Sequence, residues 1–288
     1  MRRLNKKQKQ FVYHVLNAFK NNRVIYNFLS GGAGVGKIEV ITAIVQSVLR
    51  YATKSMSFKP DNLPVVVGAP TGKAAFEVLG MTLYCIFKHP PTQHKEKLVD
   101  LDDSTVNSLR IKFEETKLFI INEIPIVSVR QLYDIDQRLR QIYCTKDSFE
   151  NKSVIVVGHL LQLPPVAGNY IFQTPTHLPL GELVGNTLWP KFEMFELDKV
   201  MRQKGDLEFY KALNNMSEGC MDLEDIQLLR SCELGVNNTP PKEAIWLFQT
   251  NAECQEHNAK VHDELGTEGF LSTAIDKVEV YILLIFIA

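Results

Sequence analysis

Closely spaced cysteines, an apolar leader and long hydrophobic runs are all missing from this sequence. The 5 cysteines are scattered and odd in number, with no C-x-x-C pair, which argues against a disulfide framework and against a zinc site. The start is basic but lacks the apolar core of a signal peptide, and no run approaches the roughly 20 apolar residues that cross a bilayer. We therefore expect a soluble, intracellular protein with reduced thiols and no membrane partner.

A strong charge imbalance is absent too. The net charge is −1 and the pI is about 6.7, so the overall charge does not indicate nucleic-acid binding. Any surface that binds nucleic acid must be a local basic patch. At 288 residues the chain can hold one large domain or two modest ones.

Apolar runs of strand length alternate with helical patterns along the chain. The runs are residues 24–29, 65–68, 118–121, 154–158 and 245–248. Between the third and fourth runs, residues 131–143 place Leu132, Ile135, Leu139 and Ile142 three and four positions apart, as on one face of an amphipathic helix. This alternation predicts an α/β fold in which helices flank a parallel sheet.

A glycine-rich segment follows the first predicted strand and fits the phosphate-binding pattern G-x-x-x-x-G-K. Its residues are Gly31, Gly32, Ala33, Gly34, Val35, Gly36 and Lys37. Glycines let successive backbone N–H groups face a phosphate, the next helix adds its dipole, and Lys37 can reach the outer phosphate oxygens. The alternative is a glycine turn without a ligand. The next position normally supplies a Mg²⁺-binding hydroxyl, but here it is Ile38.

Polar residues stand where the third and fourth predicted strands end. Asn122 and Glu123 occupy positions at which a nucleotide hydrolase has a metal-binding aspartate and then a glutamate that activates water. Glu123 suits the second role, Asn122 is an amide, and a surface Asn-Glu pair is the alternative. After the fourth strand, Gln162 precedes Leu-Pro-Pro at 163–165, a rigid turn that can hold the glutamine amide against a γ-phosphate or a water.

Two further residues are less specific. Arg202 has a guanidinium suited to stabilising a leaving phosphoryl group, although alone it would indicate a surface arginine in a salt bridge. His159 follows the fourth strand, where a lone histidine is more often solvated or packed than a ligand. We assign His159 no catalytic role.

Taken together and in order, these motifs resemble the superfamily 1 DNA helicases of the PIF type (petite integration frequency), relatives of RecD and of the helicase part of Helitron transposons. The combination of Gln-Leu-Pro-Pro-Val at 162–166 with Met-Arg-Gln at 201–203 is specific, and the resemblance covers nearly all of residues 1–262. It implies a P-loop NTPase (RecA-like) lobe, ATP as the nucleotide, Mg²⁺ as the family's metal and single-stranded DNA as partner.

The resemblance also implies roles for individual residues. Gln8 would grip the adenine base, Gln162 would sense the γ-phosphate and Arg202 would act as an arginine finger. Residues 247–253 resemble the start of the family's second motor lobe. The DNA-contacting segment would be Pro70, Thr71, Gly72 and Lys73, with Phe76, Tyr84 and Phe87 as either base-stacking or core residues.

The sequence departs from the family pattern around the metal, where no ligand position is intact. The family has serine or threonine at Ile38 and aspartate at Asn122 and at His159, and its Thr-x-His-Ser segment reads Thr-Leu-Tyr-Cys at 82–85. Each lost metal ligand is expected to cost roughly a hundred- to a thousandfold in rate. We expect binding of ATP or ADP with weak Mg²⁺ dependence, and very slow hydrolysis.

The resemblance stops past Val261, and residues 278–288 are nearly all apolar. We therefore expect a truncated or mis-predicted gene product with an incomplete second lobe. Residues 1–204 would form the first motor lobe, 205–241 a helical connector, and 242–288 the start of the second lobe plus an apolar tail. Because translocation needs two complete lobes, such a chain would not unwind DNA.

Three functions compete. The resemblance favours an ATP-dependent DNA helicase acting in replication, repair, recombination and telomere maintenance, in the nucleus or alternatively in mitochondria. The second candidate is a non-catalytic nucleotide-sensing or single-stranded-DNA-binding relic of a helicase or Helitron transposon. The third, a small-molecule kinase, is disfavoured because no segment after the glycine loop resembles an acceptor-binding lid. Stimulation of ATP hydrolysis by single-stranded DNA distinguishes the first two.

Overall fold

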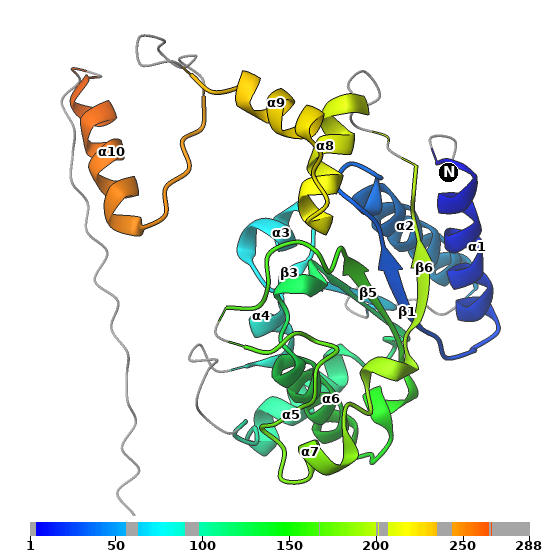
Figure 1. Cartoon of the computed structure of the whole chain (residues 1–288). Coiled ribbons are helices and arrows are strands. Elements are labelled where there is room, and N and C mark those ends of the chain that lie inside the picture. Colours follow the sequence, from blue (N-terminus) through cyan, green and yellow to red (C-terminus); the bar gives the residue numbers. More distant parts are fainter. Residues whose placement is uncertain are drawn as a thin grey trace, which may run out of the picture. The chain divides into compact units, whose positions relative to one another are not determined.

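The computed structural model describes residues 4–55, 63–89, 98–166, 168–199, 201, 207–234, 244–264 and 266. Its strands, labelled in Figure 1 where there is room, are β1 (Tyr26–Ser30), β2 (Val65–Ala69), β3 (Met81–Thr82), β4 (Leu118–Asn122), β5 (Ser153–Gly158) and β6 (Glu193–Glu196). Its α-helices are α1 (Lys6–Lys20), α2 (Lys37–Ser55), α3 (Gly72–Glu77), α4 (Leu83–Phe87), α5 (Asp103–Lys112), α6 (Val129–Tyr143), α7 (Gly181–Val184), α8 (Leu207–Glu218), α9 (Leu223–Ser231) and α10 (Asn251–Glu264). Short 3₁₀ turns are η1 (Ile124–Ile126), η2 (Ser148–Asn151) and η3 (Trp189–Lys191).

The strands form one sheet in the order β3-β2-β4-β5-β1-β6, and every neighbouring pair is parallel. Strand β5 pairs with β1 on one side and with β4 on the other, so that Gly158 lies opposite Ser30 and Val157 opposite Asn122. Four of the five predicted strands and the predicted helix at 131–143 are present as β1, β2, β4, β5 and α6. The predicted α/β fold with a parallel sheet is confirmed.

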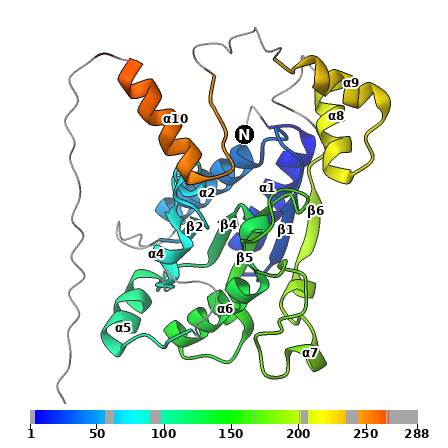
Figure 2. The same ribbon diagram turned by 60° about the vertical axis from the view of Figure 1, so that its left-hand side comes forward.

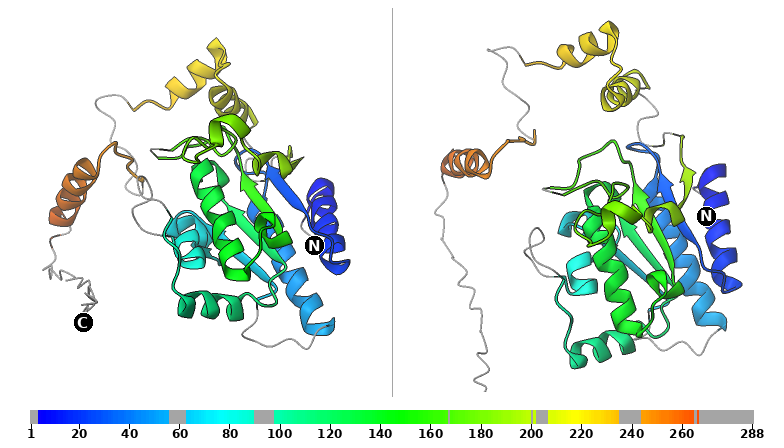
Figure 3. Two further views of the ribbon diagram at one scale, coloured as in Figure 1. Left: turned by 90° about the horizontal axis from the view of Figure 1, so that it is seen from below. Right: turned by 60° about the horizontal axis from the view of Figure 1, so that its bottom comes forward.

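Helices cover both faces of the sheet, as Figures 2 and 3 show for α1 and α2 against α5 and α6. The cause is visible in the strands, whose successive side chains point to opposite faces and are apolar on both. In β4, Leu118 and Ile120 join the cluster beneath α1 and α2, whereas Phe119 and Ile121 join the cluster beneath α4 to α6.

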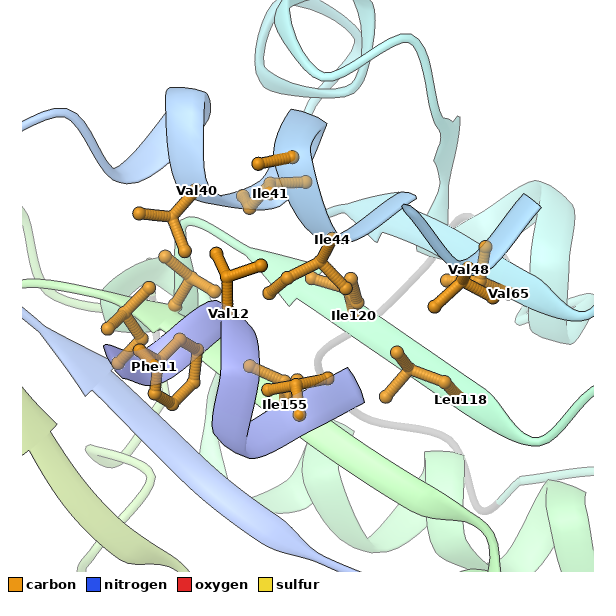
Figure 4. Packing of buried hydrophobic residues seen from close by; sticks show 14 of the residues in the cluster. Phe11, Val12, Val40, Ile41, Ile44, Val48, Val65, Leu118, Ile120 and Ile155 are labelled. Atoms are coloured by element: carbon orange, nitrogen blue, oxygen red, sulfur yellow. The ribbon is translucent and has the colours of Figure 1, made fainter. Parts of the chain in front are cut away.

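The cluster beneath α1 and α2 depends on helical spacing (Figure 4). Helix α2 contributes Val40, Ile41, Ile44 and Val48, which recur on one face, and α1 contributes Phe11 and Val12. All of these side chains are at most 1% exposed. This packing holds α2, the helix that follows the glycine loop, against the sheet.

The other face contains a buried arginine. Arg138 of α6 is 1% exposed, and its Nε donates to the carbonyl of Phe87 at the end of α4 at 2.9 Å. Its other nitrogens donate to the carbonyl of Val99 and to Oε1 of Gln141, which also accepts from the N–H of Leu101. Arg138 therefore ties α4 and the segment before α5 to helix α6.

One predicted strand is wrong. Residues 244–248 have no regular secondary structure, and Ile245 and Leu247 are about 90% exposed. Within the described ranges every strand belongs to the sheet between residues 26 and 196, so this apolar run has no partner for its backbone hydrogen bonds. Strands β3 and β6 were not predicted, because β3 has two residues and β6 reads Glu-Met-Phe-Glu, a polar edge strand.

The chain divides into two compact units, residues 1–232 and residues 233–288. The first unit contains the sheet together with α8 and α9, and the second contains α10. Among the described residues, none of the helices combines the length and the apolar character needed to span a lipid bilayer.

Replacing Arg138 with methionine should destabilise the first unit by about 1 to 3 kcal/mol, because the buried carbonyl of Phe87 loses its donor. Urea unfolding followed by circular dichroism measures this change. Arg50→Met, at an exposed position of α2, is the matched control and should change stability little. Equal effects of the two substitutions would contradict the structural role of Arg138.

Burial raises the pKa of Asp134 to about 6, against the opposing influence of Arg130 and Arg138. Because the folded state holds this proton more tightly than the unfolded chain, stability falls as the pH rises from the ordinary pKa of 3.8 through 6. Asp134→Asn should therefore raise the free energy of unfolding at pH 7 by about 1 to 3 kcal/mol and leave it nearly unchanged at pH 4. Thermal unfolding at both pH values tests this, and an equal gain at both would contradict it.

Candidate functional site

The parallel sheet brings the predicted motifs to one edge. The glycine loop follows β1, Asn122 and Glu123 follow from β4, and Gln162 lies in the loop after β5. Because β4, β5 and β1 are neighbours and point the same way, these three segments line one cleft of about 450 Å³. The lining residues are Ala33, Gly34, Gly36, Lys37, Ile38, Glu39, Glu77, Asn122, Glu123, Gln162 and Met201.

The loop has the backbone geometry of a phosphate cradle. Gly34 and Gly36 adopt positive φ angles of 76° and 82°, which favour glycine. At Gly31 a Cβ atom would lie 2.8 Å from the carbonyl oxygen of Leu197, so only glycine fits beside the segment after β6. Helix α2 begins at Lys37, directly after the loop, so the positive end of its dipole lies at the loop.

Lys37 bridges the loop. Its Nζ donates to the carbonyl oxygens of Gly31 at 2.8 Å and Gly32 at 3.0 Å. A phosphate at the start of α2 would offer the same ammonium group a charged acceptor, which makes a stronger hydrogen bond than a neutral carbonyl. The lysine is therefore held at the cleft by bonds that an anion can replace.

Gln8, the predicted adenine contact, lies behind the loop and is 1% exposed. Its Nε2 donates to the carbonyl of Val35 at 2.9 Å, and its Oε1 accepts from the N–H of Asn5 in the capping box that starts α1. A Cβ at Gly36 would lie 2.5 Å from the same Nε2. The Gln8 amide thus connects helix α1 to the glycine loop.

The residues in the metal position do not fit Mg²⁺. Ile38 has no oxygen, and its side chain packs against the core beneath α2. Asn122 is 2% exposed, offers at most one neutral amide oxygen, and its Nδ2 has no hydrogen-bond partner among the described residues. Within the same part of the chain no three acidic, histidine or cysteine side chains gather closely enough to hold a metal ion. Mg²⁺ in nucleotide sites takes one or two protein oxygens, typically carboxylates, besides waters and substrate phosphates, and Ile38 and Asn122 supply neither a carboxylate nor a hydroxyl.

Glu123 has an unusual backbone conformation. It adopts the left-handed region, with φ 57° and ψ 49°, between the end of β4 and η1. Such a conformation costs a residue with a side chain about 1 to 3 kcal/mol. Gln162 is exposed, and its N–H donates to the carbonyl of His159 at 2.9 Å in the turn after β5. Both side chains line the cleft.

Four residues near the cleft were not predicted. Glu39 and Glu77 are exposed carboxylates on its rim, and Met201 lines it while its N–H donates to the carbonyl of Gly34 at 2.9 Å. Tyr210 of α8 brings its hydroxyl within 3.2 Å of the Cβ position at Gly32. Glu39 lies two positions after Lys37 and Met201 belongs to the Met-Arg-Gln motif, so both were within reach of sequence reasoning, whereas Glu77 and Tyr210 depend on tertiary packing.

The remaining predicted residues lie as follows. Burial lowers the pKa of His159, and the positive charge of Lys37 lowers it further, so the imidazole is a neutral neighbour of the loop. Arg202 lies outside the described residues.

The predicted DNA-contacting segment is exposed at the carboxyl end of β2. Thr71, Gly72 and Lys73 are exposed, and the Thr71 hydroxyl accepts from the N–H of Ala74 to cap α3. Pro70 is partly exposed beside them. Of the aromatic candidates, Phe76 is 79% exposed and Tyr84 is 44% exposed, whereas Phe87 is a core residue at 1%.

The known proteins to which this chain is similar are ATP-dependent DNA helicases. The chain is 24% identical over 261 residues to the ATP-dependent DNA helicase RRM3 of Saccharomyces cerevisiae, and 25% identical over 254 residues to the ATP-dependent DNA helicase PIF1 of Emericella nidulans. Each match covers 86% of this chain but only 33% and 32% of the relatives. The chain therefore spans about a third of the length of these curated relatives.

Solved structures agree on the fold. The crystal structure of Pif1 helicase from Candida albicans superimposes with a TM-score of 0.67 at 22% identity, over 91% of this chain and 55% of that one. Pif1 helicase from Bacteroides, in complex with ADP-AlF3 and ssDNA, gives 0.65 at 25% identity, over 93% and 58%. The family model for PIF1-like helicases matches residues 3–227. With this match, the fold and the order of motifs around the cleft, the chain belongs to the PIF1-like helicase family.

Proposed function

We propose that this chain is the nucleotide-binding motor lobe of a PIF1-type DNA helicase, that it binds ATP or ADP in the cleft after β1, and that it binds single-stranded DNA. The observation that carries the proposal is the meeting of Lys37, Glu123 and Gln162 around one cleft beside the glycine loop. The Bacteroides relative in complex with ADP-AlF3 and ssDNA supports the choice of ligands.

Each cleft residue has a proposed role. The N–H groups from Gly31 to Lys37 and the Lys37 ammonium bind the phosphates. Glu123 orients or deprotonates the attacking water, and Gln162 contacts the γ-phosphate. Gln8 contacts the adenine after its amide leaves the carbonyl of Val35. Arg202 is proposed as the arginine finger.

Hydrolysis in this chain should be slow. The charge that develops on the phosphates during transfer is normally neutralised by a metal ion, and Ile38 and Asn122 do not supply its ligands. This observation favours a second candidate function, a non-catalytic nucleotide-sensing or single-stranded-DNA-binding module descended from a helicase or a Helitron transposon.

The proposed DNA surface is the exposed start of α3. Pro70, Thr71, Gly72 and Lys73 would contact the backbone of a single strand, and the exposed ring of Phe76 could stack with a base. Tyr84, at the start of α4, is the second exposed ring.

The cellular role, the location and the roles of the chain's segments are proposed from the family to which the chain belongs. We propose roles in replication, repair, recombination and telomere maintenance, and a nuclear or mitochondrial location. We further propose that residues 1–204 act as the first motor lobe, residues 205–241 as a connector, and residues 242–288 as part of a second lobe.

The chain should hydrolyse ATP near the background rate, with or without single-stranded DNA. The double variant Ile38→Thr/Asn122→Asp should gain about a hundredfold or more, because it restores a hydroxyl and a carboxylate for Mg²⁺. Release of inorganic phosphate measures both rates. Adding Glu123→Gln to the double variant should remove the gain. Fast, DNA-stimulated hydrolysis by the unmodified chain would contradict the proposed slow turnover.

Lys73→Ala should weaken binding of single-stranded DNA and reduce the slope of log affinity against log salt by about 0.7, the loss of one phosphate contact. Fluorescence anisotropy with a labelled oligonucleotide at several salt concentrations measures both quantities. Lys54→Ala, at an exposed position in the last turn of α2, is the control for removing a lysine elsewhere. If both variants behave alike, α3 is not the DNA surface.

A further inference from the structure

Asn122 lines the cleft and has a buried, unpaired hydrogen-bond donor. The residue ends β4, is 2% exposed and lines the cleft together with Lys37 and Ile38. Its Nδ2 has no hydrogen-bond partner among the described residues. Buried amide groups are almost always hydrogen-bonded, so an orphaned donor beside a cavity indicates a missing acceptor.

A ligand in the cleft can supply that acceptor. The two ends of a carboxamide have nearly the same shape, so a half turn about the last side-chain torsion exchanges Nδ2 and Oδ1 without new space. In its buried position the Nδ2 has no acceptor among the described residues. The half turn exchanges the two ends of the amide, so that the donor faces the cleft and Oδ1 takes the buried position. Asn122 then lies ready to donate to an oxygen of a bound molecule.

The neighbouring groups determine the charge of that oxygen. Lys37 is cationic, the start of α2 carries the positive end of the helix dipole, and Ile38 is apolar. All three favour a phosphate oxygen over a metal ion at this place. Three carboxylates also border the cleft, those of Glu39, Glu77 and Glu123. Glu39 and Glu77 are exposed, so water and salt screen them, whereas Glu123 is half-buried and its charge is opposed by Lys37 and by the start of α2.

We propose that the cleft takes its nucleotide as the metal-free polyphosphate anion, and that the Asn122 amide donates directly to a phosphate oxygen beside Lys37. The inference rests on the proposed function, since it assumes that a nucleotide binds in the cleft. Its new content is the ionic form of the bound nucleotide and the residue that selects this form. An aspartate here would repel the same oxygen unless a cation lay between them.

Isothermal titration of the full chain with ATP, once in excess EDTA and once in excess Mg²⁺, tests the ionic form. The two dissociation constants should agree within about threefold, because no protein ligand links Mg²⁺ to the cleft. Asn122→Asp should weaken binding in EDTA about ten- to a hundredfold, because the variant loses the donor and adds a repelling charge. Ile38→Thr/Asn122→Asp should instead bind about tenfold or more tightly with Mg²⁺ than without it.

Asn122→Leu is the matched control, similar in size but without donor, acceptor or charge. It should weaken ATP binding about tenfold in both buffers and gain nothing from Mg²⁺. Circular dichroism and thermal unfolding verify that each variant is folded. A clear Mg²⁺ requirement in the unmodified chain, or metal-free binding by Asn122→Leu as tight as the unmodified chain, would overturn the inference while leaving the proposed function intact. No ATP binding in either buffer, or binding that Lys37→Ala leaves unchanged, would instead overturn the proposed function.

Discussion

The parallel pairing of β5 with β1 on one side and β4 on the other is the constraint on which the site depends. In a parallel sheet the carboxyl ends of neighbouring strands meet at one edge, so residues far apart in the chain line the same cleft. The same register also sets the core, because a shift by one residue would turn the apolar side chains of β4 and β5 to the wrong faces. Stability and site geometry therefore share one cause.

The cleft combines an intact backbone with altered side chains. The positive φ angles of Gly34 and Gly36 and the close approach of Gly31 to Leu197 preserve the shape of the phosphate loop. The side chains that would turn such a loop into a metal-assisted site are different, since Ile38 is apolar, partly buried and packed against the core. Backbone shape favours an anion in either case, because it depends on N–H groups rather than on a cation.

Much of the first unit could be predicted from the sequence, because its signals are local. Four buried strands and the amphipathic helix at 131–143 follow from apolar spacing, and the loop follows from its glycines. The strand predicted from the apolar run at 245–248 is wrong, because a strand forms only where a partner strand is available, and composition alone does not show this. The contributions of Tyr210 and Glu77 to the site arise from packing between distant segments, which the spacing of residues in the sequence cannot predict.

The position of Gln8 has a consequence for how well the protein tells one nucleobase from another. Both ends of its amide are already bonded, to the N–H of Asn5 and to the carbonyl of Val35, in a site from which water is excluded. A purine that recruits this amide exchanges existing bonds for new ones, so the gain in affinity is the small difference between the two sets. Selectivity for adenine over guanine should be modest, because the side chain proposed to contact the base also supports the loop beneath the phosphates.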